Sequence, residues 1–279
     1  MSKADLHMHS TASDGGYSPS ELLLKCKEAG LSIISLTDHD TTEGIKEATE
    51  VGKTLGITVI PGVELSTKHR NKSVHMLGYQ FDIDHPILQK ELQAERQMRL
   101  ERLYQMVARL NKVNVSITAE ECLRHAKEGN VGRPHVAKVL VEKGYVQDVN
   151  EAFEKYLKTG RPGYVEKEKE WTPKEAIDLI HKAGGLAIVA HPVYYNLDEE
   201  IEKWIINDAL DGVEVYHRDH DSDTVRHYEH LVAQWEKKAN RHIYRTGGSD
   251  FHHETYGRNS EPLGKTTIPL PLAEKILQK

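Results

Sequence analysis

The stretch that decides the fold is Ala4-Asp5-Leu6-His7-Met8-His9-Ser10, a short apolar run that ends in two histidines one residue apart. Two distant segments repeat this arrangement, Leu36-Thr37-Asp38-His39-Asp40 and Gly247-Gly248-Ser249-Asp250-Phe251-His252. Each apolar run predicts a buried strand with imidazoles and carboxylates at its exit. α/β barrels build their sites from side chains at strand exits, and His, Asp and Glu gathered there favour a divalent metal.

Strands and helices alternate in both outer parts of the chain. Before residue 85, strands are predicted at 4–7, 32–37, 58–66 and 73–79, with helices at 19–29 and 42–55. After residue 158, helices at 173–183, 198–206, 222–238 and 271–278 alternate with strands at 186–190, 212–216 and 242–246. Such alternation predicts an α/β fold with a mostly parallel sheet.

The central part reads differently. Apolar residues recur at helical spacing through a long charged helix that starts near His85, and shorter helices are predicted at 119–128, 133–143 and 149–156. We interpret residues 85–158 as an all-helical insertion that caps the mouth of a barrel formed by residues 1–84 and 159–279.

Composition is that of an ordinary globular protein, with 279 residues, 38% of them apolar and 29% charged. A net charge of −6 argues against broad coating of nucleic acid. Cys26 and Cys122 are not closely spaced and suit a reducing compartment. The sequence has no apolar signal region and no segment that approaches a membrane span. We therefore expect a cytoplasmic protein that binds neither a membrane nor a stable protein partner.

Nine side chains are candidate metal ligands. His7 and His9 share one face of a strand exit, and His191 ends the fully apolar strand at 186–190. Glu64 lies among apolar residues, where burial costs several kcal/mol unless the carboxylate is paired or coordinated, so it is a candidate bridge; His75 lies on the adjacent strand. The set is His7, His9, Asp14, His39, Glu64, His75, His191, Asp250 and His252.

Taken singly, each candidate has an ordinary explanation, such as an exposed histidine pair, a turn aspartate at Asp14 or a core histidine at His75. Together they are too many for one ion and suit two or three. Their nitrogen and oxygen donors point to Mn, Fe or Zn. Asp38 and Asp40 flank His39 and are expected to fix its tautomer, although Asp40 also suits a helix cap.

These motifs resemble the PHP (polymerase and histidinol phosphatase) superfamily along the whole chain. They are Asp-x-His-x-His-Ser, Thr-Asp-His, Gly-x-Glu, a strand His, Ala-His-Pro and Ser-Asp-x-His. The resemblance implies a distorted (β/α)7 barrel with a trinuclear centre. The first ion would be held by His7, His9, Glu64 and Asp250, the second by Glu64, His75 and His191, and the third by Asp14, His39 and His252. The implied nucleophile is a metal-bridged hydroxide held by Glu64, His191 and Asp250.

Three further stretches resemble one subgroup, the nucleoside 3′,5′-bisphosphate phosphatases and related 5′–3′ exonucleases. They are Arg133-Pro134-His135, Gly160-Arg161-Pro162-Gly163-Tyr164-Val165 and Glu214-Val215-Tyr216 with His220. The resemblance implies that Arg133, His135 and Arg161 bind a second phosphate, the alternative for the arginines being surface ion pairs. Tyr164 would stack on a base or pack the linker. His217 departs from the pattern, where a less basic residue is expected.

We therefore expect a metal-dependent phosphoesterase that hydrolyses phosphate monoesters of nucleotides. Its substrates would be a nucleoside 3′,5′-bisphosphate, 5′-phosphorylated short oligonucleotides, or both. Two alternatives stay open at this point. One is a histidinol-phosphate phosphatase on the same barrel, and the other is a non-catalytic interaction module stabilised by metal.

Overall fold

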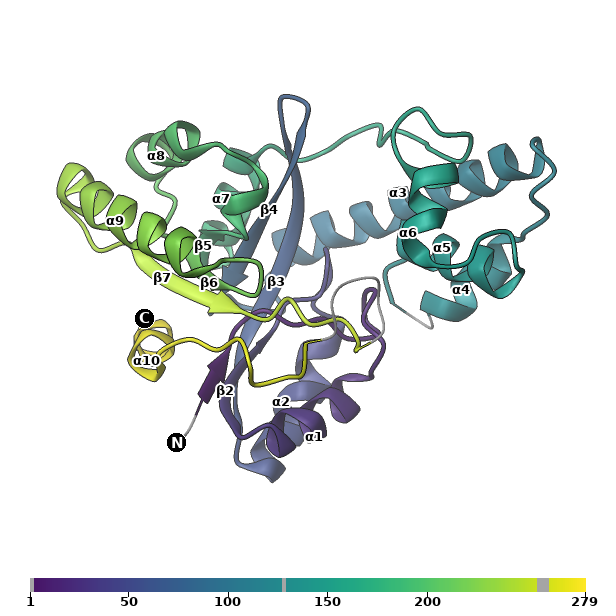
Figure 1. Cartoon of the computed structure of the whole chain (residues 1–279). Helices are drawn as coiled ribbons and strands as arrows, with labels where there is room; N and C mark the ends of the chain where they lie inside the picture. The colour runs from purple at the N-terminus through teal and green to yellow at the C-terminus, as the bar shows by residue number, and fades with distance from the viewer. Residues whose placement is uncertain (1–2, 127–128, 255–260) are drawn as a thin grey trace.

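The computed structural model describes residues 3–126, 129–254 and 261–279. Seven strands form one sheet in chain order, and the sheet curls into a nearly closed barrel (Figure 1). The strands are β1 (Lys3–Asp5), β2 (Leu31–Leu36), β3 (Thr58–His69), β4 (Lys72–Tyr79), β5 (Leu186–Val189), β6 (Gly212–His217) and β7 (Tyr244–Gly248). Neighbours pair in parallel except β4, which is antiparallel to both β3 and β5.

The barrel closes where the chain leaves β1. The Leu6 amide donates to the Gly247 carbonyl at 3.0 Å, and the His9 amide donates to the Phe251 carbonyl at 2.8 Å. These bonds bring the exits of the first and last strands together. The predicted distorted (β/α)7 barrel is therefore confirmed, and the segments 7–9 and 250–252 meet although they are far apart in the sequence.

Six helices pack around the barrel (Figure 1). They are α1 (Pro19–Glu28), α2 (Glu43–Leu55), α7 (Pro173–Lys182), α8 (Asp198–Asn207), α9 (Ser222–Ala239) and α10 (Leu270–Leu277). Their starts follow local chemistry: Ser18 and Glu21 form a reciprocal capping box on α1, as Thr172 and Glu175 do on α7. No helix among the described residues is both long enough and apolar enough to cross a membrane.

Residues 86–126 and 129–157 form a separate helical lobe beside the barrel, at the right of Figure 1. It contains α3 (Pro86–Asn111), α4 (Ala119–Ala126), α5 (Arg133–Glu142) and α6 (Val149–Ala152). The helix predicted at 149–156 is only one α-turn long and continues as a π-helix over Phe153–Leu157. The predicted end of α4, at residues 127–128, lies outside the described residues.

The long helix α3 joins two hydrophobic cores. Near its start, Leu88 and Leu92 pack into a core of the barrel. Further along, Leu103, Met106 and Leu110 pack into a core formed by the helical lobe. Because one rigid helix enters both cores, the lobe is held at a fixed place beside the barrel mouth.

Strand β3 runs unbroken through Pro61-Gly62 and extends beyond the predicted 58–66 to His69. Pro61 pairs with Leu36 of β2, and from Gly62 onward β3 pairs with β4. A Cβ at Gly62 would lie 2.1 Å from the Ser35 hydroxyl oxygen, so the two strands approach closely only because this residue is glycine. Glu64 follows at the point where β3 changes partners, and it therefore faces residues from both sides.

Candidate metal centre

The side chains predicted as ligands converge at the barrel mouth, where the parallel strands end. In a first group the His9 Nε2 atom lies 3.2 Å from both Glu64 Oε2 and Asp250 Oδ1. His7 Nε2 lies 3.3 Å from the same Glu64 oxygen and 3.6 Å from Asp250 Oδ1. Donor atoms on a tetrahedral ion with bonds of about 2.0–2.2 Å are about 3.3–3.6 Å apart, so these spacings suit one shared ion.

Glu64 is the centre of a second group. Its Oε1 atom lies 2.8 Å from His75 Nδ1 and 3.0 Å from His191 Nε2. Its Oε2 atom lies 3.1 Å from His39 Nδ1, in addition to the histidines of the first group. One buried carboxylate thus faces five imidazoles with both oxygens, the arrangement expected of a bridging ligand.

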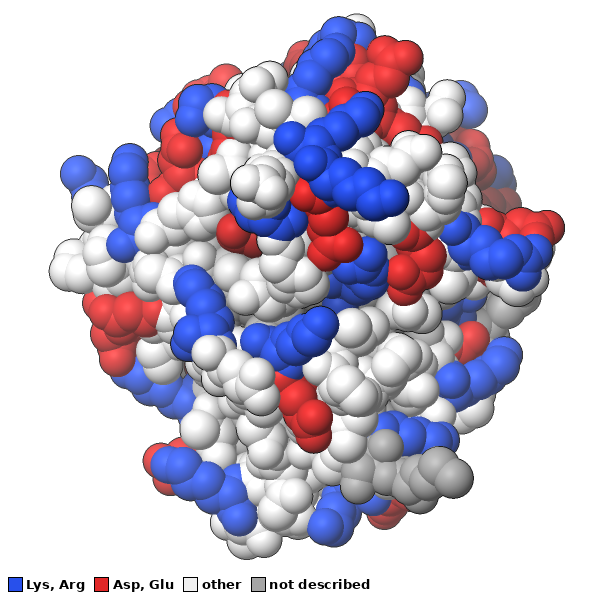
Figure 2. All heavy atoms as spheres, turned by 90° about the vertical axis from the view of Figure 1, so that its left-hand side faces the viewer, with Lys and Arg blue, Asp and Glu red and all other residues white. Residues whose placement is uncertain are grey.

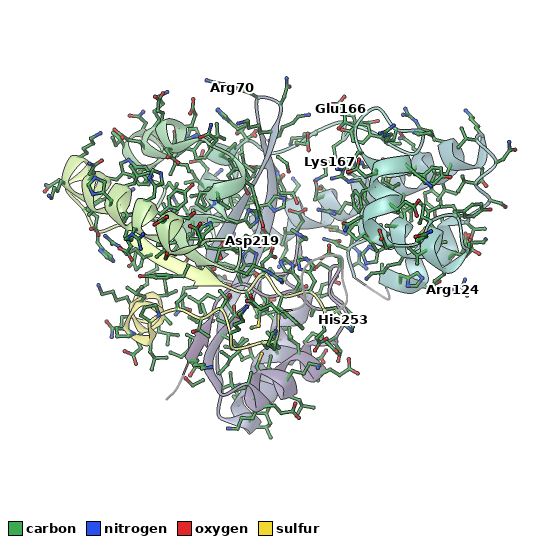
Figure 3. All side chains as sticks on the ribbon, viewed as in Figure 1. Arg70, Arg124, Glu166, Lys167, Asp219 and His253 are labelled. Carbon is green, nitrogen blue, oxygen red and sulfur yellow. The ribbon has the colours of Figure 1, made fainter. Side chains whose placement is uncertain are left out.

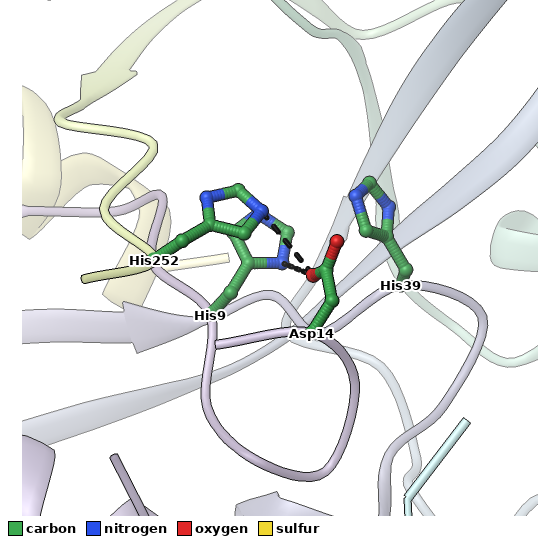
Figure 4. A group of neighbouring side chains, drawn as sticks. All are labelled: His9, Asp14, His39 and His252. Carbon is green, nitrogen blue, oxygen red and sulfur yellow. Dashed lines mark ion pairs between the residues drawn. The ribbon is translucent and has the colours of Figure 1, made fainter. Parts of the chain in front are cut away.

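The third group contains His9, Asp14, His39 and His252 (Figure 4). His252 Nε2 lies 3.2 Å from Asp14 Oδ1, and the rings of His9 and His252 stack with centroids 4.0 Å apart. The loop that carries Asp14 folds back tightly, because a Cβ at Gly15 would lie 2.3 Å from the His9 carbonyl oxygen. The turn that the sequence suggests around Asp14 therefore serves to return this carboxylate to the barrel mouth.

Several of these atoms are buried and have no hydrogen-bond partner among the described residues. They are His7 Nε2, both ring nitrogens of His9, His39 Nδ1 and Glu64 Oε2. These nitrogen and oxygen atoms lie close to one another, but the angles between them do not allow hydrogen bonds. A buried polar atom left unsatisfied costs about 1–3 kcal/mol. The cluster is therefore incomplete as protein alone and fits divalent cations, for which converging lone pairs are the correct geometry.

Burial and mutual charge shift the pKa values of the cluster strongly. Burial lowers the pKa of His39 to about 3. Burial opposes a charge on His9, yet Asp250 and Glu64 raise its pKa to about 10. Burial likewise opposes ionisation of Glu64, but His39, His75 and His7 hold its pKa well below the usual range. Because metal binding needs deprotonated ligands, cations entering this cluster displace protons.

A cavity of about 610 Å³ opens beside the cluster and is lined by Asp14, His39 and His75. Cationic side chains from the barrel and the helical lobe form much of the rest: Lys68, Arg99, Arg102, Arg133 and Lys167. Figure 3 shows Lys167 on the connection between the lobe and the barrel. The cavity therefore joins the ligand cluster to a strongly basic wall.

Three of these cations are neutralised by carboxylates. Lys68 pairs with Glu166 and Glu170, each at 3.0 Å. Lys167 pairs with Glu95 at 2.6 Å, and Arg99 pairs with Asp40.

Arg102 and Arg133 have no carboxylate partner among the described residues. Arg102 Nε donates to the Val165 carbonyl at 2.7 Å, and the Arg133 guanidinium lies over the Phe153 ring, 5.6 Å from its centroid. Burial, and then the charge of Arg133, lowers the pKa of Arg102 to about 10. Two guanidinium groups without a carboxylate partner among the described residues therefore lie in the cavity beside the cluster.

Comparison with known proteins shows the family to which this chain belongs. Residues 5–242 match the family model described as PHP domain. The chain belongs to the PHP domain family. It is 36% identical to a 5′-3′ exoribonuclease of Haemophilus influenzae, covering 90% of each chain, and 34% identical to a 3′,5′-nucleoside bisphosphate phosphatase of Chromobacterium violaceum, covering 99% of this chain and 95% of the other.

A solved structure from Bifidobacterium adolescentis, assigned as a metal-dependent phosphoesterase, superimposes with a TM-score of 0.88. It is 30% identical and covers 99% of this chain and 95% of its own. The prediction of a PHP-domain phosphoesterase is thus confirmed for the family and the class of enzyme.

Within this PHP domain, residues that the sequence analysis did not single out as supports orient the candidate ligands. Glu214 Oε1 lies 2.9 Å from His7 Nδ1, and Glu214 Oε2 accepts from the His191 amide at 2.7 Å. The Tyr195 hydroxyl lies 2.9 Å from His191 Nδ1. Partners of this kind fix the ring and the tautomer of a metal-binding histidine. Glu214 carries the same signal as Glu64, a carboxylate inside an apolar strand.

Asp38 and Asp40 act differently from the expectation that they orient His39. Asp38 accepts from the Ser10 amide and hydroxyl, both at 2.7 Å, and from the Ser13 hydroxyl at 2.6 Å. It thereby shapes the loop that carries Asp14. Asp40 has a left-handed backbone, with φ of 52°, which turns its carboxylate toward the Ser66 amide and Arg99. Neither carboxylate bonds to the His39 ring among the described contacts.

The residues predicted to contact substrate do not all lie together. Arg133, His135 and Tyr164 line the 610 Å³ cavity, but Arg161 is exposed and is not among its lining residues. The Nδ1 atom of His135 accepts from the Gly132 amide at 3.0 Å and so caps α5, while its buried Nε2 has no hydrogen-bond partner in the described ranges.

Proposed function

We propose that this PHP-domain protein hydrolyses nucleoside 3′,5′-bisphosphates and 5′-phosphorylated short oligonucleotides. The observation that carries the proposal is one cavity with two complementary ends. Within the part of the chain that the structure describes, buried candidate ligand atoms at one end lack hydrogen bonds, and Arg102 and Arg133 at the other end have no carboxylate partner. A substrate with two phosphoryl groups matches both ends.

The nine predicted ligands would hold two or three divalent ions, Mn, Fe or Zn. Such ions supply a hydroxide nucleophile at neutral pH and neutralise charge on the phosphoryl oxygens. The protein's own contribution is to fix this centre. Glu64 lies between the groups, while Glu214 and Tyr195 hold the rings of His7 and His191 in place.

Arg102 and Arg133 would grip the phosphate that is not hydrolysed. A guanidinium offers a planar pair of donors that matches phosphate oxygens, and such charge-assisted bonds are the strong ones. His135 Nε2 is a further polar atom at the cavity wall. Arg161 is left out of this proposal because it lies outside the cavity.

Recognition of a small anion suits the charge of the whole chain. The face in Figure 2 mixes basic and acidic side chains without a continuous basic surface. With a net charge of −6, long-range attraction of nucleic acid is weak. Affinity for phosphate therefore has to come from the local cavity and the bound cations.

We also propose the division into a barrel, residues 1–84 and 159–279, and a helical insertion, residues 85–158. The separate core of the insertion supports it. A cytoplasmic location is proposed because Cys26 and Cys122 are both buried and unpaired.

The test is an anaerobic assay of the metal-reconstituted protein with adenosine 3′,5′-bisphosphate and histidinol phosphate as competing substrates. We expect phosphate release from the bisphosphate with much the higher kcat/KM. Preference for histidinol phosphate would reassign the substrate. Metal-loaded protein that hydrolyses no phosphoester would favour the non-catalytic module.

A further inference from the structure

A second cavity, of about 260 Å³, also reaches the ligand cluster. It is lined by Asp250 and His252, whereas the 610 Å³ cavity is lined by His39 and His75. The two cavities share Asp14, and they share Pro134 and Phe153 of the helical lobe as a common wall. Two cavities therefore reach the cluster, one lined by His39 and His75 and the other by Asp250 and His252.

The wall of the second cavity combines positive charge with an apolar surface. Lys138 of α5 and Arg218, which follows β6, bring two cations from different parts of the chain. Val149 and Phe153 bring apolar side chains. The acidic residues that line it, Asp14 and Asp250, are both proposed metal ligands, so bound cations would neutralise them. An anion that carries a flat apolar group matches this chemistry.

We propose that the 260 Å³ cavity binds the second nucleotide of a 5′-phosphorylated oligonucleotide. The inference rests on the proposed function and extends it beyond a single nucleotide. The terminal nucleotide occupies the 610 Å³ cavity with its 5′-phosphate at Arg102 and Arg133. The phosphodiester that follows lies at the cluster, and the next nucleotide lies between Lys138, Arg218 and Phe153.

This placement makes one bond the target in both kinds of substrate. The oxygen of water bonds to phosphorus, the bond from phosphorus to the 3′ oxygen of the terminal nucleotide breaks, and that oxygen keeps the electron pair and takes a proton. A bisphosphate gives a nucleoside 5′-phosphate and inorganic phosphate, with the second cavity vacant. An oligonucleotide gives the same nucleoside 5′-phosphate and a chain one nucleotide shorter that carries a new 5′-phosphate.

The experiment compares two substrates in the metal-loaded protein, adenosine 3′,5′-bisphosphate and 5′-phosphorylated diadenylate. The measured quantity is the ratio of kcat/KM for the dinucleotide to kcat/KM for the bisphosphate. In Lys138→Ala and Arg218→Ala we expect this ratio to fall about tenfold or more, the usual effect of losing a charge-assisted phosphate contact. Lys112→Ala, an exposed lysine at the end of α3, is the matched control and should leave the ratio unchanged.

Equal losses on both substrates would overturn the inference, because they would mean that Lys138 and Arg218 support the metal centre or the fold. An unchanged ratio in both variants would overturn it as well. Wild-type protein that hydrolyses the bisphosphate but not the dinucleotide would overturn the second site and leave the phosphatase proposal standing. Wild-type protein inactive on both would overturn the proposed function itself.

Discussion

The barrel mouth and the helical lobe both bring charged side chains to one cavity, but they balance charge in opposite ways. At the barrel mouth, buried ring nitrogens and a carboxylate oxygen face one another without hydrogen bonds among the described residues. They belong to His7, His9, His39 and Glu64. On the wall next to the lobe, most cations are already paired with carboxylates, as Lys167 is with Glu95.

This difference in charge balance indicates which kind of ligand each region would bind. The barrel mouth presents buried lone pairs without hydrogen bonds among the described residues, which suits the proposed cations, whereas two guanidinium groups of the lobe suit the proposed anion. Arg99 of α3 connects the two regions, since it pairs with Asp40, which directly follows the candidate ligand His39.

The largest effect is expected at the centre of the cluster. Glu64→Gln keeps the side-chain shape but removes a charge that faces five imidazoles. We expect loss of bound metal and a fall in kcat/KM of about 10³-fold or more, since metal stabilisation of the transition state contributes several kcal/mol. Metal analysis and phosphate release measure the two effects. Glu202→Gln on α8 is the matched control, and full activity in Glu64→Gln would reduce Glu64 to a structural residue.

The next largest effect is expected at the Arg99–Asp40 ion pair, which connects the lobe to the barrel. Arg99→Leu leaves the buried Asp40 carboxylate without its cation, and removing one partner of a buried pair costs about 3–5 kcal/mol of unfolding free energy. Urea denaturation measures the loss. Arg96→Leu, in the same helix, breaks an exposed pair with Glu43 and should cost at most about 1 kcal/mol. Similar losses in the two variants would show that Arg99 does not tie the lobe to the barrel.

The anion side is tested with Arg133→Ala. We expect binding of adenosine 3′,5′-bisphosphate to weaken by about 10- to 150-fold, while hydrolysis of an aryl phosphate changes little. Arg161→Ala serves as a control, because the Arg161 side chain is exposed outside the cavity. The placement of the second phosphate would be contradicted if Arg161→Ala weakened binding and Arg133→Ala did not.

A smaller effect on metal affinity is expected at Glu214, which contacts the candidate ligand His7 but is not itself a candidate ligand. Glu214→Gln weakens the acceptor that holds His7 Nδ1, and changes at such supporting residues lower metal affinity or activity by about 10- to 100-fold. Competition with a metal chelator measures the affinity. A variant with wild-type metal affinity would show that the His7 ring is oriented by packing alone.

The sequence predicted the barrel side better than the lobe side for a physical reason. The place of a histidine or carboxylate that follows an apolar strand can be predicted from the sequence, because parallel strands end at one edge of the barrel. His7 and Asp250 could be found in this way, whereas Glu64 was found as a carboxylate inside an apolar strand. The same signal was present at Glu214 but was taken only as part of a motif.

Contacts of the lobe had no such local signal. Arg99 and Arg102 look like ordinary charged positions on a long helix, and only the packing of α3 against the barrel brings them to the cavity. Arg161 stands in a motif that resembles a family pattern, yet the turn that carries it faces outward. The role of Asp40 depended on a left-handed backbone that its sequence neighbours do not specify.

The central claim is that the buried cluster is a metal centre that hydrolyses phosphate esters. The most direct measurement is a stepwise anaerobic titration of metal-free protein with Mn²⁺, with bound metal and phosphate release from adenosine 3′,5′-bisphosphate recorded at each step. We expect binding to saturate at two or three ions per chain, with activity rising as the ions bind and disappearing with a chelator. Full activity in protein with less than one ion per chain, or saturated protein that releases no phosphate, would contradict the claim.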